Sequence, residues 1–237
     1  PTMHLLFSGN PGTGKTTVAR LIGEIYHDLG LLRRGHLIQV SASDLVGNHV
    51  GETAIKTQAV IDRALDGVLF IDEAYSLTEK DRGGFGLEAV ETLLTRMEND
   101  RGRLMVILAG YPEKMRNFLR ANPGLERRIP EANRLEFPNY EAEELSEIFW
   151  RTIEQKGFTA SVGLANKLSA LFAQMAADQR PTYGNAGEVR NLVEDMVLNF
   201  ASRHAGLPPE ELVLEIEDLP QRWNDQPSER AASLRLA

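Results

Sequence analysis

The stretch "GNPGTGKTT" (residues 9–17) matches the glycine-rich phosphate-binding loop known as Walker A. The spacing G-x-x-x-x-G-K-T is filled by Gly9, Gly14, Lys15 and Thr16. Glycines let backbone N–H groups turn inward around phosphate oxygens, and the helix that follows presents its positive end to them. The lysine of such a loop reaches the β- and γ-phosphates, while the threonine hydroxyl coordinates Mg²⁺. We therefore predict that ATP with Mg²⁺ binds at Gly9, Asn10, Pro11, Gly12, Thr13, Gly14, Lys15, Thr16 and Thr17.

A second motif, "VLFIDEA" (residues 68–74), ends an apolar run in two adjacent carboxylates. At the carboxyl end of a strand, Asp72 is placed to hold Mg²⁺ through water, opposite Thr16. Glu73 is placed to orient and deprotonate an attacking water. A kinase or a GTPase does not need this second acid, so the pair predicts hydrolysis of ATP. The alternative is a solvated acidic strand end without a catalytic role.

Apolar runs alternate with amphipathic segments through residues 1–138. Strands rich in Val, Ile and Leu that alternate with helices specify a parallel sheet covered on both faces. The prediction is an α/β P-loop domain with a five-stranded parallel sheet between helices. In its first helix we expect one buried apolar face, made of Val18, Leu21, Ile22 and Ile25. Strands are expected at 3–9, 35–42, 67–74, 103–111 and 133–138, and helices at 16–30, 52–65, 86–100 and 112–121.

The pattern changes after Pro138, where helical periodicity replaces the alternation. Three helices are expected, with no strand among them, at 141–157, 163–178 and 186–204. The predicted domains are an α/β domain at 1–138, a small all-α domain at 139–205 and a C-terminal tail at 206–237. The tail contains "LVLEIEDLPQRW", which admits a short strand, and its polar end from Asp225 is expected to be mobile.

The composition is that of an ordinary soluble globular protein, with 42% hydrophobic and 25% charged residues. A formal charge of −8 argues against a nucleic acid as the main partner, because phosphate neutralisation needs clustered Lys and Arg. The chain has no cysteine, which excludes disulfides and thiolate metal sites and fits a cytoplasmic location. No apolar run approaches the ~20 residues of a membrane span, so no membrane partner is expected. Because the first strand begins almost at Pro1, we expect this sequence to be a piece of a longer chain.

These motifs, followed by a helical domain, resemble the AAA+ ATPases, and residues 4–204 resemble the SpoVK/CbbX group in particular. That group contains a sporulation protein and the red-type Rubisco activase. The resemblance implies an ATPase that forms a homo-oligomeric ring, a hexamer, and remodels a protein substrate through a central pore. It also implies that the helical domain is a lid and that a helix and a base-contacting segment precede the first strand. The stretches that carry it are "GNPGTGKTTVA", "RRGHLIQVSASDLVG", "GETAIKTQ", "GVLFIDEAYSL", "ILAGY", "NPGLERRI", "FPNY" and "GNAGEVRN".

The resemblance places a substrate-gripping pore loop within "SDLVGNHVGET" (residues 43–53). His49, Val50 and Gly51 stand where relatives have an aromatic residue, an aliphatic residue and a glycine. A histidine keeps a flat ring but adds a titratable group with an unperturbed pKa of ~6.5. The grip on substrate is therefore expected to be weaker or pH-sensitive. The alternative is an exposed loop histidine without a role.

The resemblance also places an arginine finger within "NPGLERRI" (residues 122–129). A finger enters the neighbouring subunit's site and offsets the charge that develops on the γ-phosphate. Arg128 falls at the family's position and is the predicted catalytic finger, with Arg127 just before it. For at least one of the two, the alternative is an ordinary ion pair with a carboxylate.

Two positions depart from the pattern of the wider superfamily. Relatives read G-N-A-R where this chain has "GNAG", so Gly187 replaces the second-sensor arginine of the lid. Arg190 lies three residues further on, nearly one helical turn away on the same face. It is predicted either to contact the nucleotide phosphates or to brace the lid. The fourth strand has no polar sensor at its end except Tyr111.

The leading functional prediction is an ATP-hydrolysing ring that remodels a protein partner. The alternative is a nucleotide-gated assembly switch, or a module of a tandem-AAA or secretion-associated protein, with low turnover. His49 and Gly187 favour this alternative. The residues that oppose it are Lys15, Asp72, Glu73 and Arg128. A nucleic-acid motor conflicts with the acidic charge. A small-molecule kinase leaves the pore-like and finger-like segments unexplained.

Overall fold

The computed structural model describes residues 2–49, 51–79, 85–178, 180, 183–205 and 211–224. The chain divides between Pro138 and Asn139 into two compact units. Each unit has a hydrophobic core of its own, and the first has one on each face of its sheet. Within the described ranges, no helix combines the length and the apolar character needed to cross a membrane.

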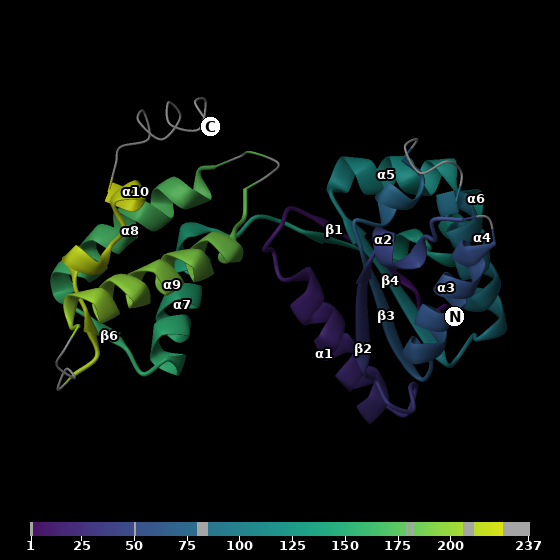
Figure 1. Cartoon of the computed structure of the whole chain (residues 1–237), viewed down its shortest axis with the longest axis horizontal. Helices are drawn as coiled ribbons and strands as arrows, with labels where there is room; N and C mark the ends of the chain where they lie inside the picture. Colours follow the sequence, from purple (N-terminus) through teal and green to yellow (C-terminus); the bar gives the residue numbers. More distant parts are fainter. Residues whose placement is uncertain are drawn as a thin grey trace. The chain divides into compact units, whose positions relative to one another are not determined.

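The first unit is built on a five-stranded sheet in which all neighbouring strands are parallel. The strand order is β2-β3-β4-β1-β5, with the strands at the centre of the unit in Figure 1. Parallel strands direct their carboxyl ends to one edge, so the loops that follow β1 and β3 emerge on the same side. The predicted sheet is thus confirmed. Its strands are β1 (Leu5–Gly9), β2 (Leu37–Ser41), β3 (Gly67–Asp72), β4 (Leu104–Gly110) and β5 (Arg134–Phe137).

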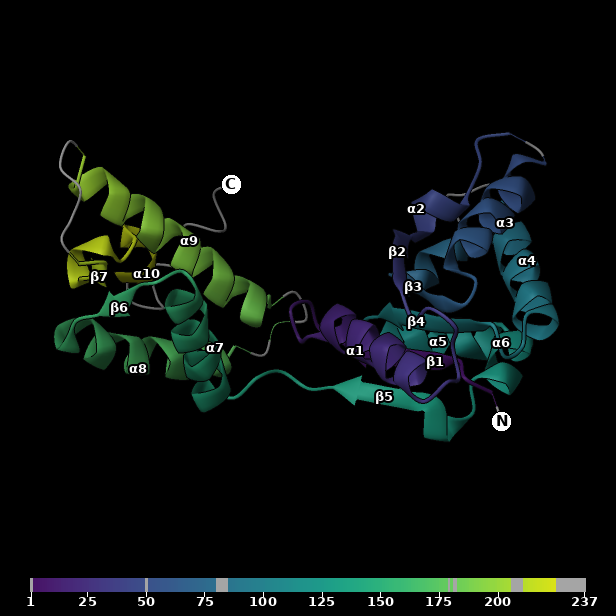
Figure 2. The same cartoon turned by 90° about the horizontal axis from the view of Figure 1, so that it is seen from below.

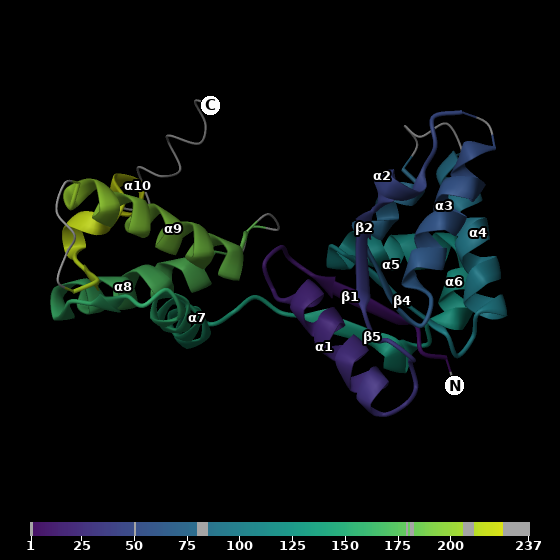
Figure 3. The same ribbon diagram turned by 60° about the horizontal axis from the view of Figure 1, so that its bottom comes forward.

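Successive residues of β1, β3 and β4 alternate between two hydrophobic clusters, one on each face of the sheet. Helix α1 (Lys15–Asp28) packs on the face that contains the fully buried Phe7 and Phe70. The other helices cover the opposite face, and Figures 1 and 3 show α1 across the sheet from α3 and α4. They are α2 (Ala42–Leu45), α3 (Glu52–Ala64), η1 (Ala74–Leu77), α4 (Phe85–Asn99), α5 (Pro112–Ala121) and α6 (Pro123–Arg128), while η3 (Glu131–Asn133) leads into β5.

The prediction of one apolar face on α1 is wrong in part. Val18 and Ile22 pack against the core, but Leu21 is 50% exposed and Ile25 is 52% exposed. Gly23 makes the close contact instead, because a Cβ there would lie 2.4 Å from the backbone oxygen of Gly35, before β2, and 3.0 Å from the Val68 side chain of β3. This close approach rotates the other apolar residues outward.

The second unit contains three main helices, α7 (Ala142–Gln155), α8 (Val162–Ala176) and α9 (Ala186–Arg203). Their facing side chains form a continuous core that includes Phe149, Phe172 and Met196, all almost fully buried. Two short strands, β6 (Thr159–Ala160) and β7 (Val213–Leu214), pair in parallel beside these helices, as Figure 2 shows. The three helices match the predicted segments. The prediction that no strand lies among them is wrong, because β6 lies between α7 and α8; a strand of two residues carries no detectable periodicity.

Residues 211–224 differ from the expected tail, because they pack into the second unit. They form β7, η4 (Ile216–Asp218) and α10 (Gln221–Asn224), and Leu214, Leu219 and Trp223 are buried in its core. The carboxylate of Asp218 is fully buried and accepts two hydrogen bonds from the Arg203 guanidinium, at 2.9 and 2.7 Å. The predicted strand in this segment corresponds to β7. The end from Asp225, predicted to be mobile, lies outside the described residues.

His4, just before β1, is 4% exposed, and its ring contacts strand β4 and helix α4. Its Nδ1 accepts a hydrogen bond from the Val106 backbone N–H at 3.1 Å, and its Nε2 lies 3.4 Å from the Met97 carbonyl oxygen. An accepting Nδ1 requires the neutral ring with the proton on Nε2. Burial, together with smaller contributions from the nearby Arg128 and Arg101, lowers the pKa of His4 to about 4.

We expect His4 to make the protein less stable in acid. Between about pH 7 and about pH 5 the unfolded chain protonates this histidine and the folded chain does not, which costs about 2 kcal/mol of unfolding free energy. The stability is therefore full above a pH of ~6.5 and is lost as the pH falls toward the folded value. Chemical denaturation at about pH 7 and about pH 5 measures this loss of unfolding free energy.

His4→Gln should lose less unfolding free energy between these pH values than the parent does, because an amide keeps both hydrogen bonds and does not titrate. His27→Gln, at an exposed histidine, is the matched control and should behave like the parent. Equal losses for the parent and His4→Gln would refute the assignment.

Candidate functional site

The phosphate-binding loop connects the end of β1 to the start of α1. Gly14 caps the helix in the left-handed region, with φ 91°, which a residue with a side chain rarely adopts. Gly9 is required for a different reason, since a Cβ there would lie 2.5 Å from the Phe137 carbonyl oxygen. Within the loop, the Thr13 hydroxyl donates to the Asn10 carbonyl oxygen at 2.8 Å. The result is a compact turn at the positive end of a helix of 14 residues.

Lys15 folds back over this loop. Its Nζ donates hydrogen bonds to the carbonyl oxygens of Gly9 at 2.9 Å and Asn10 at 2.7 Å. Burial lowers the pKa of Lys15, while the carboxylate of Asp72 opposes that shift. The ammonium is thus partly desolvated, held beside the loop and within electrostatic reach of the second motif.

Thr16 and Thr17 occupy the first turn of α1, and Asp72 is the last residue of β3. Among the described residues, no group of three or more His, Cys, Asp or Glu side chains is arranged to hold a metal ion. One hydroxyl and one carboxylate nevertheless suit Mg²⁺, which keeps several waters and takes further oxygens from a nucleotide. Thr16 and Asp72 therefore have the donor chemistry of a nucleotide-associated magnesium site.

Glu73 has an unusual backbone. Its φ of 49° and ψ of 42° lie in the left-handed region, which costs a non-glycine residue about 1–2 kcal/mol. Its backbone N–H donates to the Asp72 carboxylate at 3.0 Å, and its side chain is exposed. Strained backbone of this kind is concentrated at functional sites. Here it turns the chain sharply at the end of β3 and leaves the carboxylate exposed at the sheet edge.

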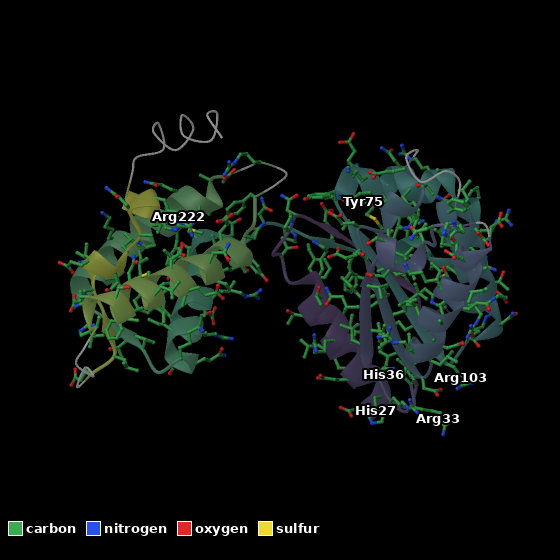
Figure 4. The ribbon with its side chains drawn as sticks, viewed as in Figure 1. His27, Arg33, His36, Tyr75, Arg103 and Arg222 are labelled. Atoms are coloured by element: carbon green, nitrogen blue, oxygen red, sulfur yellow. The ribbon has the colours of Figure 1, made fainter. Side chains whose placement is uncertain are left out.

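Tyr75 is a site residue that the sequence analysis missed. It lies two positions after Glu73, is 5% exposed, and packs 6.2 Å from the ring of Tyr111. Lys114 Nζ lies 4.5 Å from its ring centroid. Burial raises the pKa of Tyr75, and the Glu73 carboxylate raises it further, so the phenol stays neutral beside the acid. In Figure 4 it lies at the opposite end of the sheet from His36 and Arg103.

The predicted pore loop connects α2 to α3. The backbone N–H groups of Asn48 and His49 donate to the Glu52 carboxylate at 3.1 and 3.2 Å. Gly51 caps α3 with φ 83°, and the His49 side chain is exposed. Val50 lies outside the described residues. The structure thus presents His49 on an exposed loop whose backbone is held by the first turn of α3.

The two arginines of the predicted finger segment differ in their surroundings. Arg128, at the end of α6, donates to the Gly124 carbonyl oxygen at 3.2 Å and forms an ion pair of 3.5 Å with Glu98. Its side chain is 28% exposed, and its Nε is buried without a hydrogen-bond partner in the described part of the chain. Arg127 is exposed. Partly exposed ion pairs contribute little stability, so the pair with Glu98 leaves Arg128 able to exchange partners.

The lid positions lie in the first turns of α9. Nothing lies within 4 Å of the place where a Cβ on Gly187 would stand. Arg190 is exposed, so its role stays a prediction. The absence of an arginine at position 187 is therefore not imposed by crowding at the Cβ position, although Gly187 itself is half-buried.

Two family models match the chain, one within each of its two units. Residues 5–131 match the family model described as ATPase family associated with various cellular activities (AAA), and residues 141–229 match the AAA lid domain. In solved structures, the fold is similar to the AAA domain of FIGL-1 in complex with ADP, with a TM-score of 0.60 at 19% identity over 99% of this chain and 77% of the other. A katanin structure has the same TM-score at 20% identity, over 92% of this chain and 70% of the other.

Three curated relatives are more similar in sequence. ESX-3 secretion system protein EccA3 of Mycobacterium tuberculosis H37Rv is 47% identical over 81% of this chain and 32% of the relative. CbbX of Cereibacter sphaeroides is 45% identical over 86% of this chain and 65% of the relative. Stage V sporulation protein K of Bacillus subtilis is 42% identical over 85% and 62%. This chain spans about a third of the first and less than two thirds of the others. The matched domains, the fold and the phosphate loop together show that the chain belongs to the AAA family of ATPases.

Proposed function

We propose that this chain binds ATP with Mg²⁺ at the loop 9–17 and hydrolyses it, using Glu73 as the general base. The observation that carries the proposal is the convergence of Lys15, Asp72 and Glu73 at one edge of the sheet. Lys15 would exchange the two loop carbonyls for β- and γ-phosphate oxygens. Thr16 and Asp72 would hold Mg²⁺, which offsets charge on the phosphates.

The neighbours of Glu73 support its assigned role. Its exposed carboxylate accepts a proton from water, and the backbone bend after Asp72 keeps it at the sheet edge. Tyr75 stays protonated beside it and is therefore available as a hydrogen-bond donor rather than as a second base. General-base catalysis of this kind contributes about 10²–10⁴-fold.

We further propose that the chain acts in a homo-oligomeric ring, a hexamer, on a protein substrate in the cytoplasm. Arg128 is the proposed finger, and His49, Val50 and Gly51 form the proposed pore loop. The support is the match to the AAA family and lid models, together with the exposed position of His49.

A second candidate is a nucleotide-gated switch within a larger secretion-associated protein, with low turnover. EccA3, named as a secretion system protein, is as similar to this chain as CbbX is. Gly187 favours this candidate, because an exchange of arginine for glycine removes a lid contact to phosphate. Steady-state ATPase activity with and without a protein partner separates the two candidates.

Glu73→Gln should bind ATP with the parent affinity and hydrolyse it about a hundredfold more slowly or worse, because an amide does not accept the proton from water. Titration with a fluorescent ATP analogue and a phosphate-release assay measure the two properties. Glu79→Gln makes the same change at the carboxylate paired with Lys114 and should retain activity. Unchanged turnover in Glu73→Gln would remove the general-base role.

Arg128→Ala should assemble like the parent and lose about a thousandfold in turnover, because a finger stabilises transition-state charge in the neighbouring site. Sedimentation velocity and ATPase assays over a range of protein concentrations test this. Arg127→Ala is the matched neighbour and should keep its activity. Full turnover by an isolated monomer, or loss in Arg127→Ala alone, would contradict the assignment to Arg128.

Gly187→Arg should strengthen ATP binding by about tenfold, as expected for one charge-assisted hydrogen bond to phosphate. Gly187→Ala is the matched control. It raises the helix propensity of this position, which should increase the unfolding free energy by about 1 kcal/mol, but it adds no group that could reach phosphate. Fluorescent-nucleotide titration and thermal melting distinguish the two effects. Equal ATP affinity in both variants would show that position 187 does not reach the nucleotide.

A further inference from the structure

Asn185, the residue before α9, is fully buried in a strained backbone conformation. Its φ is 48° and its ψ is −125°, a combination normally left to glycine. The side chain of an N-cap asparagine ordinarily accepts a hydrogen bond from a backbone N–H in the first turn of the helix. Asn185 makes no such capping hydrogen bond. The strain and the lost cap both indicate that the side chain is used elsewhere.

The amide of Asn185 bonds instead to the first two residues of the second unit. Its Oδ1 accepts from the Tyr140 backbone N–H at 3.0 Å, and its Nδ2 donates to the Asn139 side-chain oxygen at 3.1 Å. The second Nδ2 hydrogen goes to the Tyr183 carbonyl oxygen at 3.1 Å. The start of α9 is thus fastened to a segment 45 residues away, directly after the division at Pro138.

On the other side of Pro138, Phe137 is fixed within the first unit. It pairs with Gly9 in the β1–β5 ladder, and its ring lies 4.8 Å from the ring of Phe7. Its carbonyl oxygen lies so close to Gly9 that no side chain fits there. Proline also confines Phe137 to extended backbone. The connection is therefore held at both ends, with one residue between the two anchors.

We propose that Asn185 is a positioning residue that confines the hinge between the two units to Pro138. Because Asn139 and Tyr140 are fastened to α9, the second unit turns as one body about this residue. The first anchor lies against Gly9 of the phosphate loop, so only three consecutive residues, 137–139, connect this loop to the start of α9. The inference goes beyond the proposed function, and its test does not depend on ATP hydrolysis.

The experiment uses the absence of cysteine in this chain. Glu24→Cys in α1 and Lys167→Cys in α8 introduce one exposed thiol in each unit, and a spin label is attached to each thiol. Electron–electron double resonance then gives the distribution of distances between them, without nucleotide and with ADP. Both tryptophans, Trp150 and Trp223, lie in the second unit, so their fluorescence reports separately whether that unit is folded.

Asn185→Gly accepts the backbone conformation but removes the amide. Asn139 and Tyr140 then lose the hydrogen bonds that hold them to the start of α9, so the distribution should broaden by about 1.5-fold. Asn199→Ala is the matched control. It removes one hydrogen bond, donated by the side-chain amide to the Asp218 carbonyl oxygen, within the second unit and away from the connection. It should leave the distribution unchanged.

A distribution in Asn185→Gly as narrow as the parent's, with tryptophan fluorescence intact, overturns the proposal. If Asn185→Gly unfolds the second unit, Asn139→Ala decides, because it removes the acceptor of the Asn185 Nδ2 hydrogen bond, keeps Asn185 itself and should still broaden the distribution. A narrow distribution in Asn139→Ala then overturns the proposal. If the widths follow the expectation but no ATP is hydrolysed, the hinge stands and the proposed function fails.

Discussion

The close approach of Gly9 to Phe137 is the constraint on which the rest of the structure depends. A parallel ladder brings the end of β1 against the end of β5, and the 2.5 Å between the Gly9 Cβ position and the Phe137 oxygen excludes any side chain. The same glycine opens the phosphate loop. One residue therefore serves strand pairing, phosphate binding and the start of the connection to the second unit, and a substitution there disturbs all three.

The carboxyl edge of the sheet brings one cation and two carboxylates of the chain together. Lys15 is held by two carbonyl oxygens and lies within electrostatic reach of Asp72. Glu73 is exposed by a left-handed bend, while Tyr75 remains neutral because it is buried next to this acid. Such a site presents one cation and two carboxylates to a triphosphate and its metal. The arrangement suits hydrolysis better than it suits transfer to a second organic substrate.

The similarities show how little the ATPase module reveals about its substrate. CbbX, stage V sporulation protein K and an ESX-3 secretion system protein match this chain at comparable identity. Each relative extends beyond the matched part. These relatives carry different names, so similarity in the ATPase domain does not by itself identify a partner.

The sequence by itself determined the five strands, the main helices and the nucleotide motifs, because periodicity and fixed spacing are local properties of the chain. It missed β6 and the packing of residues 211–224, since a two-residue strand and the Asp218–Arg203 pair depend on contacts distant in sequence. It also predicted Leu21 and Ile25 to be buried, although the close contact between Gly23 and Gly35 turns them outward. Only the tertiary structure decided that Tyr75 lies beside the acid and that Asn185 fastens α9 to the connection. The burial of Tyr75 against Tyr111 and the hydrogen bonds of Asn185 both depend on residues distant in sequence, which no local pattern records.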